Sequence, residues 1–124
     1  FSSVAGYSKF GSYTPNQNDN GPFVYLGFKP RFLMIKATGQ IYSGVNGNWY
    51  IIDSARSTFN VATATMAPNQ NYAEDTNWGA NGIMDILSNG FKIRDDGLAF
   101  NSTTSSSFVY FAFAETPFKY SRAR

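Results

Sequence analysis

FVYFAFAE, at residues 108–115, is the stretch of sequence that decides the fold. Alternate residues of an extended strand point to opposite faces of a sheet. One face of this strand therefore carries Phe108, Tyr110 and Ala112, and the other carries Val109, Phe111 and Phe113. Because both faces carry aromatic rings, we predict a strand in the centre of a sheet, ended by Pro117, which cannot donate to a sheet ladder.

Two further strands are predicted earlier in the chain, at residues 23–28 and 31–37, with a bend or bulge at Pro30 between them. The run from Phe32 to Lys36 is nearly all apolar. Such a run is typical of a strand that is covered on both faces, or of one whose outer face meets a partner.

A first hairpin is predicted from the Asn46-Gly47-Asn48 turn signal, because Asn-Gly between apolar runs is a strong hairpin signal. Its strands would be residues 40–43 and 49–53. A second hairpin joins residues 83–87 to residues 91–94 around Ser88-Asn89-Gly90.

Helical periodicity over three turns is absent from the sequence. Residues 55–66 could hold one helical turn at most, because their β-branched residues, such as Thr58 and Val61, disfavour more. The fold class predicted is all-β, an antiparallel β-sandwich of the jelly-roll-like kind with long polar loops between short strands.

Residues 11–124 are predicted to form a single β-sandwich domain, which is an ordinary domain size. Residues 1–10 resemble residues 111–120, because an initial Phe, a small residue after it and a Lys-aromatic pair recur at the same spacing. Either residues 1–10 are the end of a preceding unit or a linker strand in a tandem array, or two short aromatic strands are alike by coincidence.

The composition excludes several classes of function. Aromatic residues make up 18% of the chain and charged residues 15%, which is low beside the roughly 25% typical of soluble domains. The net charge is +2 with basic residues scattered singly, so we expect no nucleic-acid partner. There is no Cys and no His, which removes the usual metal ligands and the commonest general base. We therefore expect no metal and no cofactor. We also expect no membrane insertion, because no apolar run approaches the ~20 residues that a membrane-spanning helix needs.

Several polar residues have simple structural interpretations. Asp53 and Arg56 are expected to form an ion pair or a side-chain-capped turn after a strand. Glu115 is expected to pair with Arg31, Lys36 or Arg94, since buried charges are paired, although a carboxylate there could also be a base with a raised pKa. Asp85, Asp95, Asp96 and Glu115 could supply a glycosidase pair, but no motif relates any two of them.

The candidate ligand-binding residues lie in the Gly- and Asn-rich loop around Trp78. A Trp in such a loop is either tucked back onto the core or displayed, and displayed aromatics beside amides suit sugar faces and protein contacts. The candidate contact surface consists of Asn69, Asn71, Tyr72, Asn77 and Trp78, whereas Trp49 is expected in the core.

Five segments, taken in order, resemble a β-rich domain that recurs in tail, fibre and other virion proteins of tailed bacteriophages. The resemblance covers nearly the whole chain, and the segments are residues 11–14, 21–36, 49–56, 87–94 and 109–120. Residues 69–81 are longer than the usual pattern. The resemblance implies a location in the virion and a structural or adhesive role, and it supplies no catalytic residues.

Three functions follow as hypotheses. The first is a non-catalytic virion structural protein, namely a tail or fibre module that mediates host-surface attachment or subunit assembly. Its expected partners are other virion proteins and copies of itself, in a homotrimer or another symmetric assembly. The second is a carbohydrate-binding, adhesin-like module with a host-surface glycan as partner, or a capsid decoration protein. The third, an enzyme that cleaves surface polysaccharide, is disfavoured because His is missing and the carboxylates are unplaced.

Overall fold

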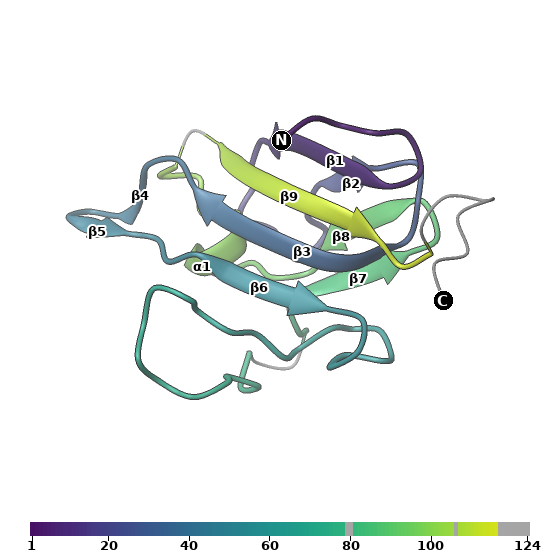
Figure 1. Ribbon diagram of the computed structural model, residues 1–124. Helices are drawn as coiled ribbons and strands as arrows, with labels where there is room; N and C mark the ends of the chain where they lie inside the picture. Colours follow the sequence, from purple (N-terminus) through teal and green to yellow (C-terminus); the bar gives the residue numbers. More distant parts are fainter. Residues whose placement is uncertain (79–80, 106, 117–124) are drawn as a thin grey trace.

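The structure, a computed structural model, describes residues 1–78, 81–105 and 107–116, and it consists of two packed antiparallel sheets (Figure 1). In the four-stranded sheet the order is β1 (Ser8–Tyr13), β9 (Phe108–Ala114), β3 (Pro30–Ala37) and β6 (Tyr50–Asp53). In the three-stranded sheet the order is β2 (Phe23–Tyr25), β8 (Gly90–Ile93) and β7 (Met84–Leu87).

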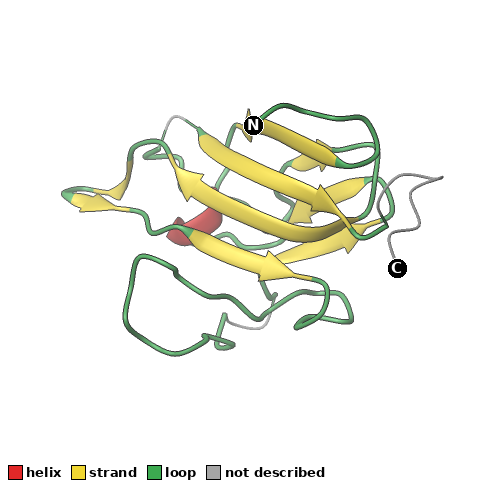
Figure 2. Cartoon of the chain, in the orientation of Figure 1, coloured by secondary structure: helices red, strands yellow, loops and turns green. Residues whose placement is uncertain are grey.

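Two smaller elements complete the fold (Figure 2). A hairpin, β4 (Gln40–Tyr42) and β5 (Val45–Asn46), projects from the end of β3, and a short helix, α1 (Leu98–Asn101), contacts β3 and β4. The predicted all-β sandwich is confirmed. Its winding resembles a jelly roll, because the chain passes from one sheet to the other between β1, β2 and β3 and again between β8 and β9.

The decisive strand β9 lies between β1 and β3, as its two apolar faces predicted. The bulge predicted at Pro30 is also present, as a shift in register between Pro30 and Phe32. The strand predicted at residues 23–28 is shorter than expected, because β2 ends at Tyr25. Past that point the amides of Leu26 and Gly27 both donate to the carbonyl of Asn89 instead of continuing a ladder.

The second predicted hairpin is confirmed, with Ser88 and Asn89 as the turn between β7 and β8. The turn predicted for the first hairpin, at residues 46–48, is wrong. Residues 43 and 44 turn the chain between β4 and β5, where Gly44 has a φ of +79°, and β6 pairs with β3 instead of β4. Gly47 serves close packing, since a Cβ atom there would lie 3.0 Å from the Ile41 side chain.

The described part of the chain has no helix between residues 55 and 66, and α1 was not predicted. No helix in the described residues is long and apolar enough to cross a membrane. The predicted boundary after Phe10 falls inside β1, where Phe10 pairs with Phe111 and Ser8 with Phe113. The two similar segments are therefore neighbouring strands over their described part, since residues 117–120 lie outside it.

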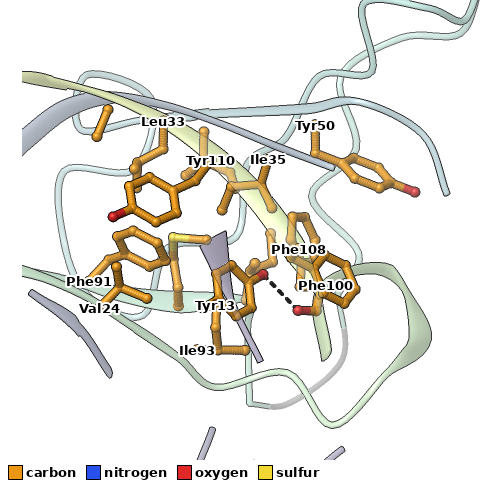
Figure 3. Packing of buried hydrophobic residues seen from close by; sticks show 14 of the residues in the cluster. Tyr13, Val24, Leu33, Ile35, Tyr50, Phe91, Ile93, Phe100, Phe108 and Tyr110 are labelled. Carbon is orange, nitrogen blue, oxygen red and sulfur yellow. Dashed lines mark hydrogen bonds between the residues drawn. The ribbon is translucent and has the colours of Figure 1, made fainter. Parts of the chain in front are cut away.

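The core fills the space between the sheets (Figure 3). Tyr13 stacks on Phe108 with ring centroids 5.3 Å apart and meets Phe91 edge-on at 6.0 Å. Its hydroxyl donates to the carbonyl of Phe100 at 2.7 Å, so this buried polar group is satisfied. Leu33, Ile35, Ile52, Phe91, Ile93, Phe100 and Phe108 are fully buried.

Both edges of the four-stranded sheet are covered by the chain itself. On β1, the amide of Phe10 donates to the Ser3 hydroxyl at 3.2 Å, and Val4 and Ser8 exchange backbone hydrogen bonds. On β6, Ile51 and Met66 exchange backbone hydrogen bonds in both directions. Covered edges cannot accept a strand from another chain.

In the three-stranded sheet, the edge at β7 is covered, and the edge at β2 is engaged at one carbonyl. Along β7, the side-chain amide of Asn60 imitates a strand residue, because its Oδ1 accepts from the Ile86 amide at 2.8 Å and its Nδ2 donates to the Ile86 carbonyl at 3.0 Å. The Ala62 amide donates to the Met84 carbonyl at 2.8 Å. On β2, the Tyr25 carbonyl accepts from the Lys9 ammonium at 2.7 Å.

Asp95 is a buried carboxylate just before α1. Its Oδ1 accepts from the Gly97 amide at 2.9 Å, whereas Oδ2 has no hydrogen-bond partner among the described residues. Burial raises the pKa of Asp95 above its usual value, although the hydrogen bond from Gly97 opposes the rise. Ionised Asp95 therefore destabilises the folded state at neutral pH.

We expect Asp95→Asn to stabilise the protein at pH 7 and to do so less as the pH falls. The pKa of Asp95 is higher in the folded state than in the unfolded state, so ionised Asp95 lowers the stability of the fold above the folded-state pKa. This loss of stability disappears as the pH falls through the folded-state pKa toward the unfolded-state value of about 3.9. Urea unfolding of both proteins between pH 4 and pH 7 measures the difference. Asp19→Asn, at an exposed carboxylate, is the control, and a gain for Asp95→Asn that is independent of pH would contradict the assignment.

Candidate interaction surface

The outer face of the four-stranded sheet, turned toward the viewer in Figure 1, is apolar although it faces away from the core. One register row crosses all four strands as Phe10, Phe111, Met34 and Ile51. All four side chains are half-buried. An antiparallel sheet with one solvated face is normally polar on that face, so this row needs an explanation.

Aromatic rings on this face contact one another in a continuous series. The ring of Phe111 lies 5.7 Å from that of Trp49 and 5.6 Å from that of Phe10. Phe113 lies 5.8 Å from Phe10 and 6.0 Å from Phe32. Tyr7 packs on Phe113 at 6.2 Å and Phe1 on Phe10 at 5.7 Å. We call this surface the aromatic face; its rings are Phe1, Tyr7, Phe10, Phe32, Trp49, Phe111 and Phe113.

The strands contribute two charged residues to this face, and both charges are engaged within the domain. Lys36 donates to the Gly47 carbonyl at 2.9 Å, and its ammonium lies 5.6 Å from the centre of the Trp49 ring. Asp53 pairs with Arg56 at 2.9 Å and accepts from the Arg56 amide, which confirms the interpretation given to these two residues. The centre of a protein interface is typically aromatic and poor in charge, and this face fits that description.

Next to Trp49 lies a group of amide side chains that hold one another. The Oδ1 atom of Asn48 accepts from Asn69 at 3.1 Å and from Gln70 at 2.8 Å, and its Nδ2 donates to the Tyr72 hydroxyl at 3.1 Å. Asn69 also accepts from the Trp49 backbone amide at 3.1 Å. These groups fix the loop against β6, and their hydrogen bonds are already used inside the domain.

The structure brings together only part of the predicted contact surface. Asn69 and Tyr72 join the amide group, and Tyr72 is 53% exposed. Asn71 and Asn77 are exposed, and the backbone amide of Asn77 donates to the Asp75 carboxylate at 2.9 Å. Whether these residues bind a ligand stays a prediction.

Two placements were predicted for Trp78, tucked back onto the core or displayed to solvent. The structure shows the first of them. Its ring packs edge-on against Tyr50 at 5.6 Å and Phe100 at 5.2 Å, and its Nε1 donates to the Thr65 hydroxyl at 3.0 Å. Trp49, which was expected in the core, lies on the aromatic face instead. Of the two tryptophans, Trp49 is therefore the one that lies on an outer face of the domain. Gly79 and Ala80, which follow Trp78, lie outside the described residues.

Two of the four carboxylates considered for catalysis, Glu115 and Asp85, are held in ion pairs. Glu115 pairs with Lys29 at 2.8 Å and with Arg31 at 3.9 Å, so one predicted partner is right and Lys29 was missed. The hydrogen bond from Lys29 lowers the pKa of Glu115, which contradicts the alternative of a raised one. Asp85 pairs with Arg94 at 2.7 Å. Within residues 1–78, 81–105 and 107–116, no three acidic side chains gather into a group that could hold a metal ion.

Comparison with known proteins gives one match. Residues 1–117 match the model of a family described as Domain of unknown function (DUF7483). No curated protein and no solved structure matches the chain.

Proposed function

We propose that this chain, which belongs to the family described as Domain of unknown function (DUF7483), is a non-catalytic structural module of a bacteriophage virion, of the tail or fibre type, that assembles with copies of itself through the aromatic face. The observation that carries the proposal is the unbroken series of rings on a face that would otherwise meet water. Large exposed apolar patches on folded domains mark interaction sites. The virion location rests on the sequence resemblance alone.

Two features favour a second copy of this chain as the occupant of the aromatic face. Face-to-face packing is the route that this surface offers, because the edges at β6 and β7 are engaged by hydrogen bonds within the chain. The two charges on the face are also engaged within the domain, since Asp53 pairs with Arg56 and the Lys36 ammonium donates to the Gly47 carbonyl. A largely apolar surface whose charges are already engaged can pack on a second copy of itself, as symmetric assemblies require.

We expect the protein to self-associate at micromolar concentration, with a mass of two or three times 13.7 kDa by size-exclusion chromatography with light scattering. Phe111→Lys places a charge at the centre of the aromatic face and is expected to yield monomer, because burying an unpaired charge in an interface is unfavourable. Phe59→Lys is the matched control, since Phe59 is 84% exposed and lies outside the face.

Circular dichroism must show that both variants are folded. A wild-type protein that remains monomeric at concentrations of hundreds of micromolar would remove the assembly proposal, as would a Phe111→Lys variant that assembles like the wild type.

A further inference from the structure

A cavity of about 370 Å³ lies at the end of the three-stranded sheet where β7 begins and β8 ends, and no ring of the aromatic face lines it. It is lined by Asp19, Asn20, Val61, Asn81 and Arg94. Arg94 follows β8 and continues the outward-pointing series of Lys92. The lining residues come from four segments that are distant in sequence, so the fold itself assembles this cavity.

Two glycines bring the walls of the cavity together. A Cβ atom on Gly21 would lie 2.7 Å from the carbonyl of Ile93, so only glycine lets the loop that carries Asn20 approach the end of β8. A Cβ atom on Gly82 would lie 2.6 Å from the Val61 side chain, and this close approach sets Val61 beside the segment that carries Asn81.

Two parts of the cavity wall, the Arg94 guanidinium and the backbone of the loop that carries Asp19, are held in place by hydrogen bonds within the domain. The Arg94 guanidinium is oriented by the hydrogen bond from its Nε to Asp85 at 2.7 Å, and its two terminal nitrogens have no hydrogen-bond partner among the described residues. The loop that carries Asp19 is fixed by Asn101, whose Nδ2 donates to the Asn18 carbonyl at 2.9 Å. Preorganised groups of this kind lose little freedom on binding.

The side chains that face the cavity have unused hydrogen-bonding groups. Neither the Asp19 carboxylate nor the side-chain amides of Asn20 and Asn81 have a partner among the described residues. Together they offer planar acceptors and donors from a carboxylate, two amides and a guanidinium, with Val61 as one apolar contact. Such a set matches a ligand that carries several adjacent hydroxyl groups on a compact apolar ring.

We propose that this cavity binds one uncharged saccharide unit, whose vicinal hydroxyl groups hydrogen-bond to Asp19, Arg94 and the two asparagines. The volume is near the lower end of the range of small-molecule sites, which suits a single ring. The charge of Arg94 is balanced by Asp85, so Asp19 leaves the site with negative charge and an acidic sugar is repelled. This site is independent of the aromatic face and of self-assembly.

Saturation-transfer NMR with glucose, galactose, mannose, N-acetylglucosamine and glucuronate tests the proposal on the Phe111→Lys protein, or on the wild type should it be monomeric. We expect at least one neutral sugar to bind in the millimolar range, and glucuronate to bind more weakly than glucose. Asp19→Ala should weaken the neutral sugar at least about tenfold, because hydrogen bonds to charged groups contribute strongly to affinity. Asp96→Ala, at an exposed carboxylate that is not in the lining, should leave binding unchanged.

Asp19 makes no side-chain contact with described residues, so its replacement is not expected to unfold the protein, and a thermal melt checks this. Absence of binding by every neutral sugar overturns the proposal. Binding that survives Asp19→Ala also overturns it, because the sugar would then occupy another surface. Neither outcome bears on the assembly proposal, which is measured by mass.

Discussion

Asn101→Asp is expected to lower the free energy of unfolding by about 3–5 kcal/mol. Asn101 is fully buried, and its Oδ1 accepts from the Asn16 amide at 2.8 Å. Its Nδ2 donates toward three oxygens, the Oδ1 of Asn16 and the carbonyls of Asn18 and Asp95, at 2.9, 2.9 and 3.0 Å. The aspartate has the same shape but would place a carboxylate oxygen against those three acceptors.

Urea unfolding at pH 7 measures this loss. Asn71→Asp introduces the same charge at an exposed position and serves as the control, for which we expect a change within about 0.5 kcal/mol. The Asn101→Asp protein should recover part of its stability in acid, because a protonated aspartate can donate one hydrogen bond. Equal stabilities of the two variants would show that the Asn101 network is not needed to hold the loop.

Gly90→Ala is expected to cost at least about 3 kcal/mol, because the added methyl group overlaps the neighbouring strand. Gly90 pairs with Tyr25, and a Cβ atom at Gly90 would lie 2.0 Å from the backbone carbonyl oxygen of Val24. Backbone cannot move aside as a side chain can. Either β2 separates from β8, or the three-stranded sheet shifts against the core.

Gly39→Ala is the matched control for this substitution. The nearest atom to a Cβ there is the Ser105 hydroxyl oxygen at 3.8 Å, an ordinary contact. Replacing glycine with alanine at such a site restricts the unfolded chain, so we expect unchanged or slightly higher stability. Thermal unfolding of both variants compares them, and a Gly90→Ala protein as stable as Gly39→Ala would mean that the two strands do not pack this closely.

The sandwich could be predicted because its signals are local. Alternation in residues 108–115 places Phe108 inside and Phe111 outside, and that pattern alone makes β9 central. The first hairpin failed because Asn46-Gly47 and Ser43-Gly44 are both turn sequences, and the sequence does not say which glycine packs against Ile41. It is Gly47 that packs there, and a Cβ atom on Gly47 would also lie 3.2 Å from Ala37 at the end of β3.

The candidate site was harder to predict because it depends on contacts between distant residues. Trp78 lies in a loop rich in turn residues, yet its ring packs against the buried rings of Tyr50 and Phe100. Asn101 meets Asn16, a residue 85 positions away in the chain. The aromatic face did have a signal, since the apolar run at Phe32 predicted either a strand covered on both faces or one whose outer face meets a partner.

The covered sheet edges also protect a crowded arrangement of such domains from fusing into fibrils. Amyloid grows when backbone amides of one molecule template the next, and at Ile86 that role is already filled by the side chain of Asn60. Copies of this domain that lie close together would therefore meet along this edge through their side chains. Such contacts can separate again without any chain unfolding.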